Sequence, residues 1–313
     1  MKRALLVGND HYTLYNDLDG CANDVRALHP LLARHEDDSL NFECVALTDV
    51  GRDELIAAVE ALLAPGAESA LLFFAGHGGQ TPNDVVLCTS DGTEKTPGLG
   101  FNDVLGIIAR SSVSEIVVLL DCCFAGGAGG VPALASEAAT LHPGLSILAA
   151  SRNDQTSAES AVGRGVFSTY VEGALDGGAA DTLGRVDLGS LYAYVSESFG
   201  AWDQRPTFKA NITRPLELRY CEPYLARRQL REVLALFTDP FEDYPLDPSY
   251  EPTVDPRDAE HERVFELLQK ARASRLVEPV GEDHLYYAAI NSTGCALTPL
   301  GRHYHHVNAE DRL

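Results

Sequence analysis

Two apolar stretches set the architecture of this chain, FFAGHGG at residues 73–79 and VVLLDCCFAGG at residues 117–127. Each is a short hydrophobic run that stops at glycines, the pattern of a buried strand followed by a loop. Each also places a reactive side chain, His77 or Cys123, where the run stops. Because ligands of open parallel sheets bind outside the carboxyl ends of the strands, we expect the imidazole and the thiol at one edge of a sheet. A cysteine nucleophile and its proton-transfer partner need this arrangement.

The first two-thirds of the chain alternates strand and helix patterns, which predicts a mainly parallel sheet with helices on both faces. We expect strands near 3–7, 41–47, 69–75, 115–121 and 145–150, and a last strand at 215–219. We expect helices near 22–35, 52–64, 101–110, 166–176 and 187–199. Asn23 and Asp24 are candidates to cap the first of these helices.

Composition narrows the class of function. With 313 residues, 45% of them hydrophobic, the chain can hold one large domain or two smaller ones. A net charge of −22 argues against binding to nucleic acid or anionic membranes, because phosphate contacts need clustered Lys and Arg. We expect no membrane span and no signal peptide. The seven cysteines, odd in number and mostly in apolar segments, indicate reduced thiols in a cytoplasmic protein.

Three motifs, in order, carry a resemblance to a known family: GCAND at 20–24, GHG at 76–78 and DCCFAG at 121–126. They resemble the caspase-like cysteine peptidases of clan CD, and among these the metacaspases and their bacterial relatives, the orthocaspases. His77 and Cys123 are 46 positions apart, close to the roughly 50 residues that separate the two in caspases. RALLVG at 3–8 resembles the first strand of the family, and the resemblance covers about residues 3–220.

The resemblance implies an α/β fold, a caspase-hemoglobinase-like three-layer sandwich with a mainly parallel six-stranded sheet, in a peptidase domain at residues 1–222. Residues 223–258 are predicted to form a helix and an acidic, proline-rich linker or wrapping arm. Residues 259–313 resemble a winged-helix interaction module, with a helix at 259–275, an apolar strand at 285–290 and a turn at 291–294. We therefore expect a small C-terminal α+β module.

Cys123 is the candidate nucleophile and His77 its proton carrier. Thiolate is the reactive form of cysteine, and a histidine titrates near neutral pH, so it can take and return the proton. Strand alternation puts residues 121 and 123 on one face and Cys122 on the other, so we expect Cys122 in the core. A single Cys after an apolar run is more often structural, but the motifs around His77 and Asp24 reverse that weighting. The resemblance implies that the backbone N–H groups of Gly78 and Cys123 form the oxyanion hole.

The resemblance also implies an acidic S1 pocket for a substrate arginine or lysine. Asp24 and Asp121 would bind the cation through charge-assisted hydrogen bonds, and Cys21 and Ala75 would line the pocket. Many metacaspases carry Ser where this chain has Ala75. Two other interpretations stay open: Asp24 as a plain helix cap, and Asp121 as a carboxylate that caps the turn after it.

No cofactor is expected. Calcium activates some metacaspases through acidic residues after the Cys, but the loop at 126–144 holds a single acid, Glu137, so we predict no calcium or other metal site. By resemblance this loop borders the substrate groove. Residues 149–159 resemble a family segment at the same edge of the sheet, and two interpretations of them stay open: a wall of the groove, or an ordinary loop. Residues 111–151 contain no Lys or Arg, so an enzyme that cuts after basic residues cannot cut itself there. Arg164 is the nearest downstream candidate that looks exposed.

The leading hypothesis is a cytoplasmic cysteine endopeptidase with a Cys-His dyad, which cleaves proteins after Arg, less often Lys, in a bacterial stress, cell-death or antiviral defence response. An activating protease or regulatory protein would act through the C-terminal module. The alternative is a catalytically silent adaptor of the same fold that works through that module. A DNA-binding regulator is disfavoured, because residues 259–313 carry eight acids against six Lys and Arg.

Overall fold

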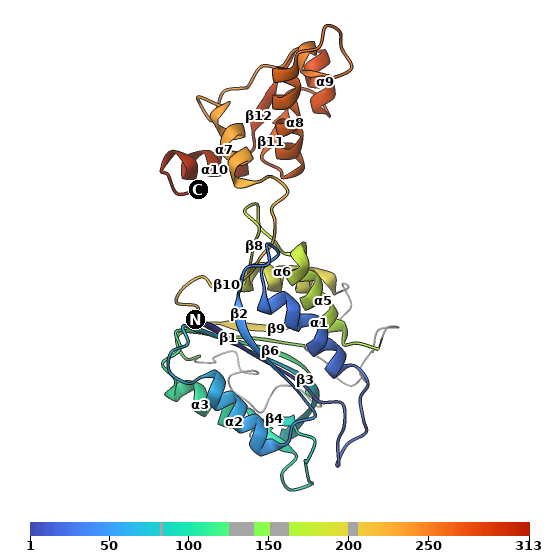
Figure 1. Ribbon diagram of the computed structural model, residues 1–313, viewed down its shortest axis with the longest axis vertical. Coiled ribbons are helices and arrows are strands. Elements are labelled where there is room, and N and C mark those ends of the chain that lie inside the picture. The colour runs from blue at the N-terminus through green and yellow to red at the C-terminus, as the bar shows by residue number, and fades with distance from the viewer. Residues whose placement is uncertain (82–83, 125–140, 151–162, 200–205) are drawn as a thin grey trace. The chain divides into compact units, whose positions relative to one another are not determined.

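The computed structural model divides the chain into two compact units (Figure 1). The first comprises Met1–Ala180 and Arg185–Cys221, and the second Asp181–Gly184 and Glu222–Leu313. The structure describes residues 1–81, 84–124, 141–150, 163–199 and 206–313, with the backbone alone at 123–124. Within these residues, no helix has the length and apolar character needed to cross a membrane.

An eight-stranded sheet forms the centre of the first unit. Its main path, in spatial order, is β2 (Phe42–Thr48), β1 (Lys2–Gly8), β3 (Ser69–Thr81), β6 (Glu115–Phe124), β7 (Leu145–Ala149) and β9 (Thr207–Ala210). The first five strands run parallel, and β9 is antiparallel to β7. Two short antiparallel strands, β4 (Asp84–Cys88) and β5 (Gly98–Gly100), extend the sheet from the end of β3. The predicted mainly parallel sheet is confirmed, with these two strands added.

The sixth strand of the main path is not the one predicted. The segment predicted at 215–219 does form a strand, β10 (Glu217–Tyr220), but it pairs with β8 (Arg185–Asp187) in a separate two-stranded sheet. The sheet edge is taken instead by β9, whose four residues, TFKA, are too few to show a period of two.

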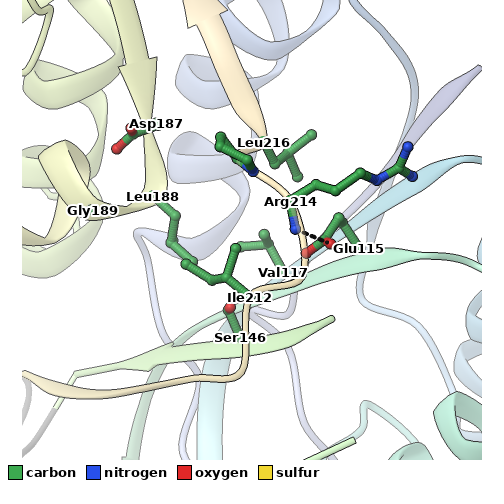
Figure 2. Close-up of a pocket in the computed structure, with 10 residues that line it drawn as sticks. Glu115, Val117, Ser146, Asp187, Leu188, Gly189, Ile212, Arg214 and Leu216 are labelled. Atoms are coloured by element: carbon green, nitrogen blue, oxygen red, sulfur yellow. Dashed lines mark hydrogen bonds between the residues drawn. The ribbon is translucent and has the colours of Figure 1, made fainter. Parts of the chain in front are cut away.

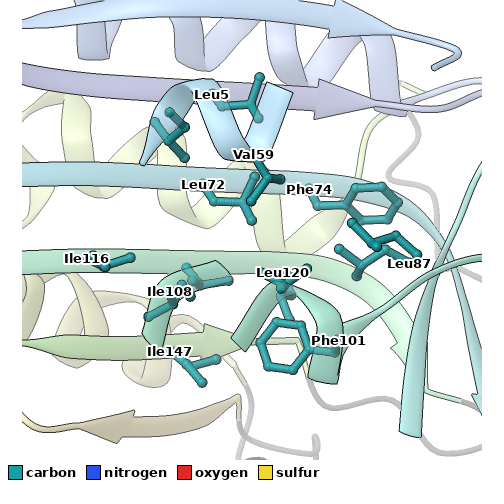
Figure 3. Close-up of a cluster of buried hydrophobic side chains, with 14 of the residues drawn as sticks. Leu5, Val59, Leu72, Phe74, Leu87, Phe101, Ile108, Ile116, Leu120 and Ile147 are labelled. Atoms are coloured by element: carbon teal, nitrogen blue, oxygen red, sulfur yellow. The ribbon is translucent and has the colours of Figure 1, made fainter. Parts of the chain in front are cut away.

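Helices cover both faces of the sheet (Figure 1). One face carries α1 (Cys21–Ala33), α5 (Val166–Gly173) and α6 (Leu188–Ser198), and the other carries α2 (Arg52–Leu62) and α3 (Phe101–Arg110). The alternation of β6 explains both layers: Val117 and Leu119 pack with the first group of helices, and Val118 and Leu120 with the second (Figure 3). The three-layer sandwich is therefore confirmed.

The second unit has a core of its own. Its elements are α7 (Arg227–Ala235), the 3-10 turn η3 (Pro248–Tyr250), α8 (Ala259–Ala273), β11 (Val277–Pro279), α9 (Leu285–Ile290), β12 (Cys295–Leu297) and α10 (Pro299–Ala309). β11 and β12 pair antiparallel. The acidic segment 238–258 contributes buried Leu246 and Tyr250 to this core.

The strand predicted at 285–290 is wrong, because these residues form the helix α9. Leu285, Ala288 and Ala289 are buried, whereas Tyr286 and Tyr287 are exposed. Burial at positions i, i+3 and i+4 follows a helical period, not the alternation of a strand. In the chain, β11 precedes α9 and β12 follows it. The resemblance of this unit to a winged helix stays a prediction.

Candidate active site

The two predicted reactive positions lie side by side on neighbouring strands. β3 and β6 are parallel partners at ten successive positions, and within this ladder the Cα of His77 is the register partner of the Cα of Cys123. The expectation that the strand stops at Ala75 is wrong: β3 continues through the glycines to Thr81, because β4 pairs with its last four residues. The sheet itself therefore sets the distance between the two backbone positions.

Residues after β1 hold His77 in place. The hydroxyl of Tyr12 accepts a hydrogen bond from the backbone N–H of His77 at 2.9 Å and donates one to the carbonyl of Asn9 at 2.8 Å. The rings of Tyr12 and Tyr15 lie 4.8 and 5.3 Å from the imidazole, centroid to centroid. This approach needs a glycine at position 76, since a Cβ on Gly76 would lie 2.5 Å from the Tyr12 hydroxyl.

The ring nitrogens of His77 have different roles. Its Nε2 lies 2.8 Å from the backbone carbonyl oxygen of Asn16. A carbonyl oxygen only accepts hydrogen bonds, so Nε2 carries the proton, and in the neutral ring Nδ1 carries the lone pair. Nδ1 is therefore the nitrogen able to take a proton from a thiol. The Asn16 carbonyl is the orienting group that the sequence did not identify.

Asp24 and Asp121 come together around one glycine. Gly165, just before α5, donates its N–H to the Oδ2 of Asp24 at 3.1 Å. A Cβ on Gly165 would lie 3.0 Å from that oxygen and would collide with the Oδ2 of Asp121, so no other residue allows this approach. Ser168, fully buried in the first turn of α5, donates to the Oδ2 of Asp121 through its hydroxyl at 2.6 Å and its N–H at 3.2 Å. The buried carboxylate of Asp24 on α1 and the partly buried carboxylate of Asp121 on β6 thus share one site.

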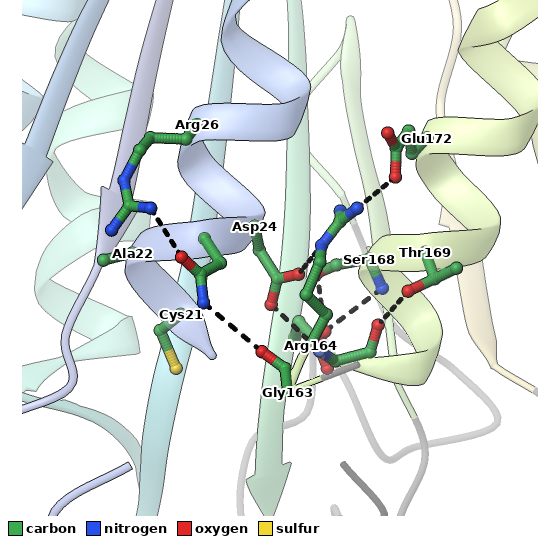
Figure 4. A network of polar contacts seen from close by, with 12 residues as sticks. Cys21, Ala22, Asp24, Arg26, Gly163, Arg164, Ser168, Thr169 and Glu172 are labelled. Atoms are coloured by element: carbon green, nitrogen blue, oxygen red, sulfur yellow. Dashed lines mark hydrogen bonds and ion pairs between the residues drawn. The ribbon is translucent and has the colours of Figure 1, made fainter. Parts of the chain in front are cut away.

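Arg164 completes this network (Figure 4). Its Nε lies 2.9 Å from the Oδ1 of Asp24, and its Nη1 pairs with the carboxylate of Glu172 on α5. The Arg164 side chain is 18% exposed and that of Asp24 is 2% exposed, so the expectation that Arg164 is exposed is wrong. The remaining nitrogen, Nη2, is buried and makes no hydrogen bond to any described residue.

The site raises the pKa of its buried acid. Burial, and after it the charge of Asp121, raises the pKa of Asp24 to about 7, although contacts with Arg164 and Gly165 oppose the shift. Burial also raises the pKa of the Cys21 thiol far above its usual value. Cys21 therefore stays a protonated thiol near these acids, whereas a cation close to Asp24 favours the ionised form of that acid.

The first helix is capped by Asp10 rather than by Asn23 or Asp24. The carboxylate of Asp10 accepts hydrogen bonds from the N–H groups of Cys21 at 2.8 Å and Ala22 at 3.1 Å. The interpretation of Asp24 as a plain cap is therefore wrong: its carboxylate instead faces the segment that leads into α5.

The remaining predicted site residues lie on β3 and β6. Cys122 is 3% exposed and packs in the core under α2 and α3, as expected. Ala75 is buried and is the register partner of Asp121. Gly78 follows His77 in β3, between β6 and β4. The side chain of Cys123, and all but the ends of the segments 126–144 and 149–159, lie outside the described residues.

One pocket of about 200 Å³ lies elsewhere in the first unit (Figure 2). Glu115, Val117, Ile212 and Leu216 are among its lining residues. Glu115 opens β6, so this pocket lies at the end of the strand opposite to Asp121. The buried carboxylate of Glu115 accepts hydrogen bonds from Thr213 and, at 2.8 Å, from the N–H of Arg214. These contacts give Glu115 a structural role.

Four residues of this site were not predicted from the sequence: Tyr12, Asn16, Ser168 and Arg164. Tyr12 and Asn16 act through a hydroxyl and a backbone carbonyl in a loop without periodicity. Ser168 and Arg164 border a segment whose signal is the dipeptide Arg164-Gly165, a cation next to a small residue just before a helix. That pattern alone would not have located a buried ion pair.

Comparisons with known proteins bear on the family of this chain. Residues 1–217 match the family model of the caspase domain, Peptidase C14. Metacaspase-1 of Schizosaccharomyces pombe is 29% identical over 152 residues, which cover 42% of this chain and 35% of that protein. Metacaspase-1 of Scheffersomyces stipitis is 31% identical over 126 residues, 37% of this chain and 29% of that protein. The chain thus matches about a third of the length of these curated relatives.

A solved structure agrees on the fold. Protein GSU0716 from Geobacter sulfurreducens is similar with a TM-score of 0.53 at 16% identity, over 71% of this chain and 99% of that one. At this identity the likeness concerns the fold alone. The family model, by contrast, spans more than half of the chain and includes all three motifs. From the strand register, the paired acids and this match, the chain belongs to the caspase-domain family.

Proposed function

We propose that this protein is a cysteine endopeptidase that cleaves after Arg, and less often after Lys. The observation that carries the proposal is that Asp24, buried beside Asp121, already holds a guanidinium at 2.9 Å, that of Arg164. A site that binds one arginine side chain has the charge and geometry to bind another. Lysine is a weaker ligand because its ammonium cannot form the two parallel hydrogen bonds of a guanidinium.

In the proposed reaction the thiol of Cys123 gives its proton to Nδ1 of His77, and the sulfur attacks the carbonyl carbon of the scissile bond. Backbone N–H groups of Gly78 and Cys123 hold the resulting oxyanion, an effect worth roughly 10²–10³ in rate. The C–N bond then breaks as the imidazolium protonates the leaving amine, and a thioester remains. Water, deprotonated by His77, hydrolyses the thioester and restores the thiol.

The dyad supplies both the nucleophile and the proton carrier, so we propose no metal or other cofactor. We expect activity to be unchanged by EGTA. The substrates would be proteins with exposed Arg or Lys, and the setting a bacterial stress, cell-death or antiviral response in the cytoplasm, which rests on the family resemblance alone.

Peptides with Arg, Lys or Asp at P1 test the proposal, with the wild type and Cys123→Ala. We expect the wild type to cleave after Arg faster than after Lys and not to cleave after Asp. We expect kcat to fall by at least about 10³-fold in Cys123→Ala. Cys122→Ala is the matched control: it removes the neighbouring thiol from the core and should keep most of the activity. Cleavage that survives Cys123→Ala, or the absence of cleavage after Arg, would sink the proposal, and the second result would favour the adaptor alternative.

A further inference from the structure

A cation of the chain itself occupies the acidic site. Arg164 stands between two glycines, and its guanidinium bridges the buried Asp24 and the Glu172 carboxylate on α5 (Figure 4). The proposed function assigns the contact with Asp24 to the P1 side chain of a substrate. Two guanidinium groups cannot share the Oδ1 of Asp24 without placing two like charges in contact.

We propose that Arg164 is a tethered competitor for the P1 site: its guanidinium holds Asp24 in the resting protein, and a substrate arginine binds by displacing it. This inference rests on the proposed function and adds a residue that sets the apparent affinity. The enzyme then discriminates among substrates by how well their P1 side chain can replace an arginine, which favours Arg over Lys and excludes neutral side chains.

The fit of Arg164 is incomplete, which makes displacement feasible. Its Nη2 is buried without a hydrogen-bond partner in the described part of the chain, and a buried donor without a partner is costly. The nearby Oδ2 of Asp121 is already bonded to Ser168. A free guanidinium that enters from the substrate side is not restrained by the Arg164 backbone, so it can direct its five donors with fewer left unpaired.

The surroundings of Arg164 also allow its guanidinium to move away from Asp24. Glu172, its second partner, is 33% exposed, against 2% for Asp24, so the ion pair with Glu172 can persist while the guanidinium leaves the buried acid. Gly163, on the N-terminal side, has a φ of +64°, and a Cβ there would meet no atom of the described residues within 4 Å. The other neighbour, Gly165, keeps its N–H on Asp24. The exchange therefore requires a side-chain movement, not the loss of the whole segment.

Two other roles for Arg164 make different predictions. If Arg164 were a permanent wall of the pocket, its removal would weaken the binding of P1 arginine. If its unpaired Nη2 were there to bind a substrate carboxylate, cleavage after Asp would exist in the wild type and disappear with Arg164. A competitor alone predicts tighter binding of cations when it is removed.

The experiment compares wild type, Arg164→Ala and Arg164→Gln at pH 8 and at pH 9, because the loss of Arg164 removes contacts that lower the raised pKa of Asp24. KM and kcat are measured with P1-Arg, P1-Lys and P1-Asp peptides, and the affinity for benzamidine is measured by calorimetry. We expect KM for P1-Arg and the Kd for benzamidine to fall by about 10-fold, as when the competent state is one-tenth populated, with kcat within about 3-fold. Arg164→Gln, which keeps hydrogen-bonding groups near both acids, covers the case in which the alanine variant fails to fold.

Arg26→Ala is the matched control. Arg26 lies on the same helix two residues after Asp24, is exposed and bonds to Asn23 at 2.6 Å, so its loss removes an equal charge without opening the site. We expect KM to stay unchanged in this variant. A KM that rises or stays constant in both Arg164 variants would overturn the competitor role while leaving the proposed function intact. No cleavage after Arg and no benzamidine binding in any variant would instead defeat the proposed function itself.

Discussion

The hydroxyl of Tyr12 is the sharpest test of how the loop after β1 positions His77. The substitution Tyr12→Phe removes one oxygen and keeps the ring, which lies 4.8 Å from the imidazole. The lost oxygen accepts from the His77 N–H at 2.9 Å and donates to the Asn9 carbonyl at 2.8 Å. Burial raises the pKa of Tyr12 far above its usual value, so the group is a neutral hydroxyl throughout the working pH range.

Both partners of this hydroxyl are backbone groups that lose a hydrogen bond in the variant. Each partly buried group left unpaired costs about 1 kcal/mol or somewhat more, so the free energy of unfolding should fall by about 2 kcal/mol. In a unit of this size that corresponds to roughly 4–8 °C in Tm. Because His77 also loses a restraint, kcat for a P1-Arg peptide should fall by about 10-fold. KM should stay the same, since the acids around Gly165 are untouched.

Tyr15→Phe is the control for this measurement. The ring of Tyr15 lies 5.3 Å from the imidazole, but its hydroxyl interacts with the thiol of Cys88 rather than with His77. Tyr15→Phe should lower kcat far less than Tyr12→Phe does. Peptide cleavage assays give kcat for both variants, and urea denaturation gives their unfolding free energies. Equal effects of the two variants on kcat, or an unchanged unfolding free energy in Tyr12→Phe, would refute the positioning role of the hydroxyl.

Further predictions concern the acids and the second unit. Ser168→Ala removes a 2.6 Å hydrogen bond to the Asp121 carboxylate and should lower the unfolding free energy by about 2 kcal/mol in urea denaturation. Gly165→Ala sets a methyl group against both acids and should raise KM for arginine peptides several-fold; an unchanged KM would contradict the close approach. Because the pKa of Asp24 is raised from 3.8 to about 7, the folded protein retains a proton that the unfolded chain releases. Its unfolding free energy should therefore decline from pH 4 to 7, and a urea series on Asp24→Asn should show a flatter decline. Leu268 is fully buried, so Leu268→Ala should lower the unfolding free energy of the second unit by about 2–5 kcal/mol and speed amide hydrogen exchange within 222–313.

The strands and helices of the first unit were largely predictable because long apolar runs and helical periods are local signals. β1, β2, β3, β6 and β7 begin within one residue of the predicted positions, except that the glycines at 76–79 concealed the continuation of β3. Pairing decided that case, since β6 pairs with residues 76–78 and β4 with residues 78–81, and together they keep those glycines extended. For the same reason the short strand β9 and the separate pairing of β10 could not be read from composition.

The site was predictable in part. The motifs predicted His77 and the two acids as site residues, and the structure brings Asp24 and Asp121 together. It could not identify Asn16, whose carbonyl carries no side-chain signal, nor Arg164, whose burial depends on the tertiary position of α5. The error at α9 has another cause: in LYYAAI the aromatic residues favour a strand, but packing buried Leu285 and the alanines one helical turn away.

The unbroken ladder between β3 and β6 has a practical consequence. Because the backbone hydrogen bonds of the sheet fix the spacing of positions 77 and 123, the connecting segments can be exchanged for those of distant relatives without altering it. Chimaeras that carry loops of other proteins on this sheet should therefore keep the spacing between the backbone positions that bear the imidazole and the sulfur. A displacement of the two strands by one residue would abolish it while leaving the circular dichroism spectrum nearly native.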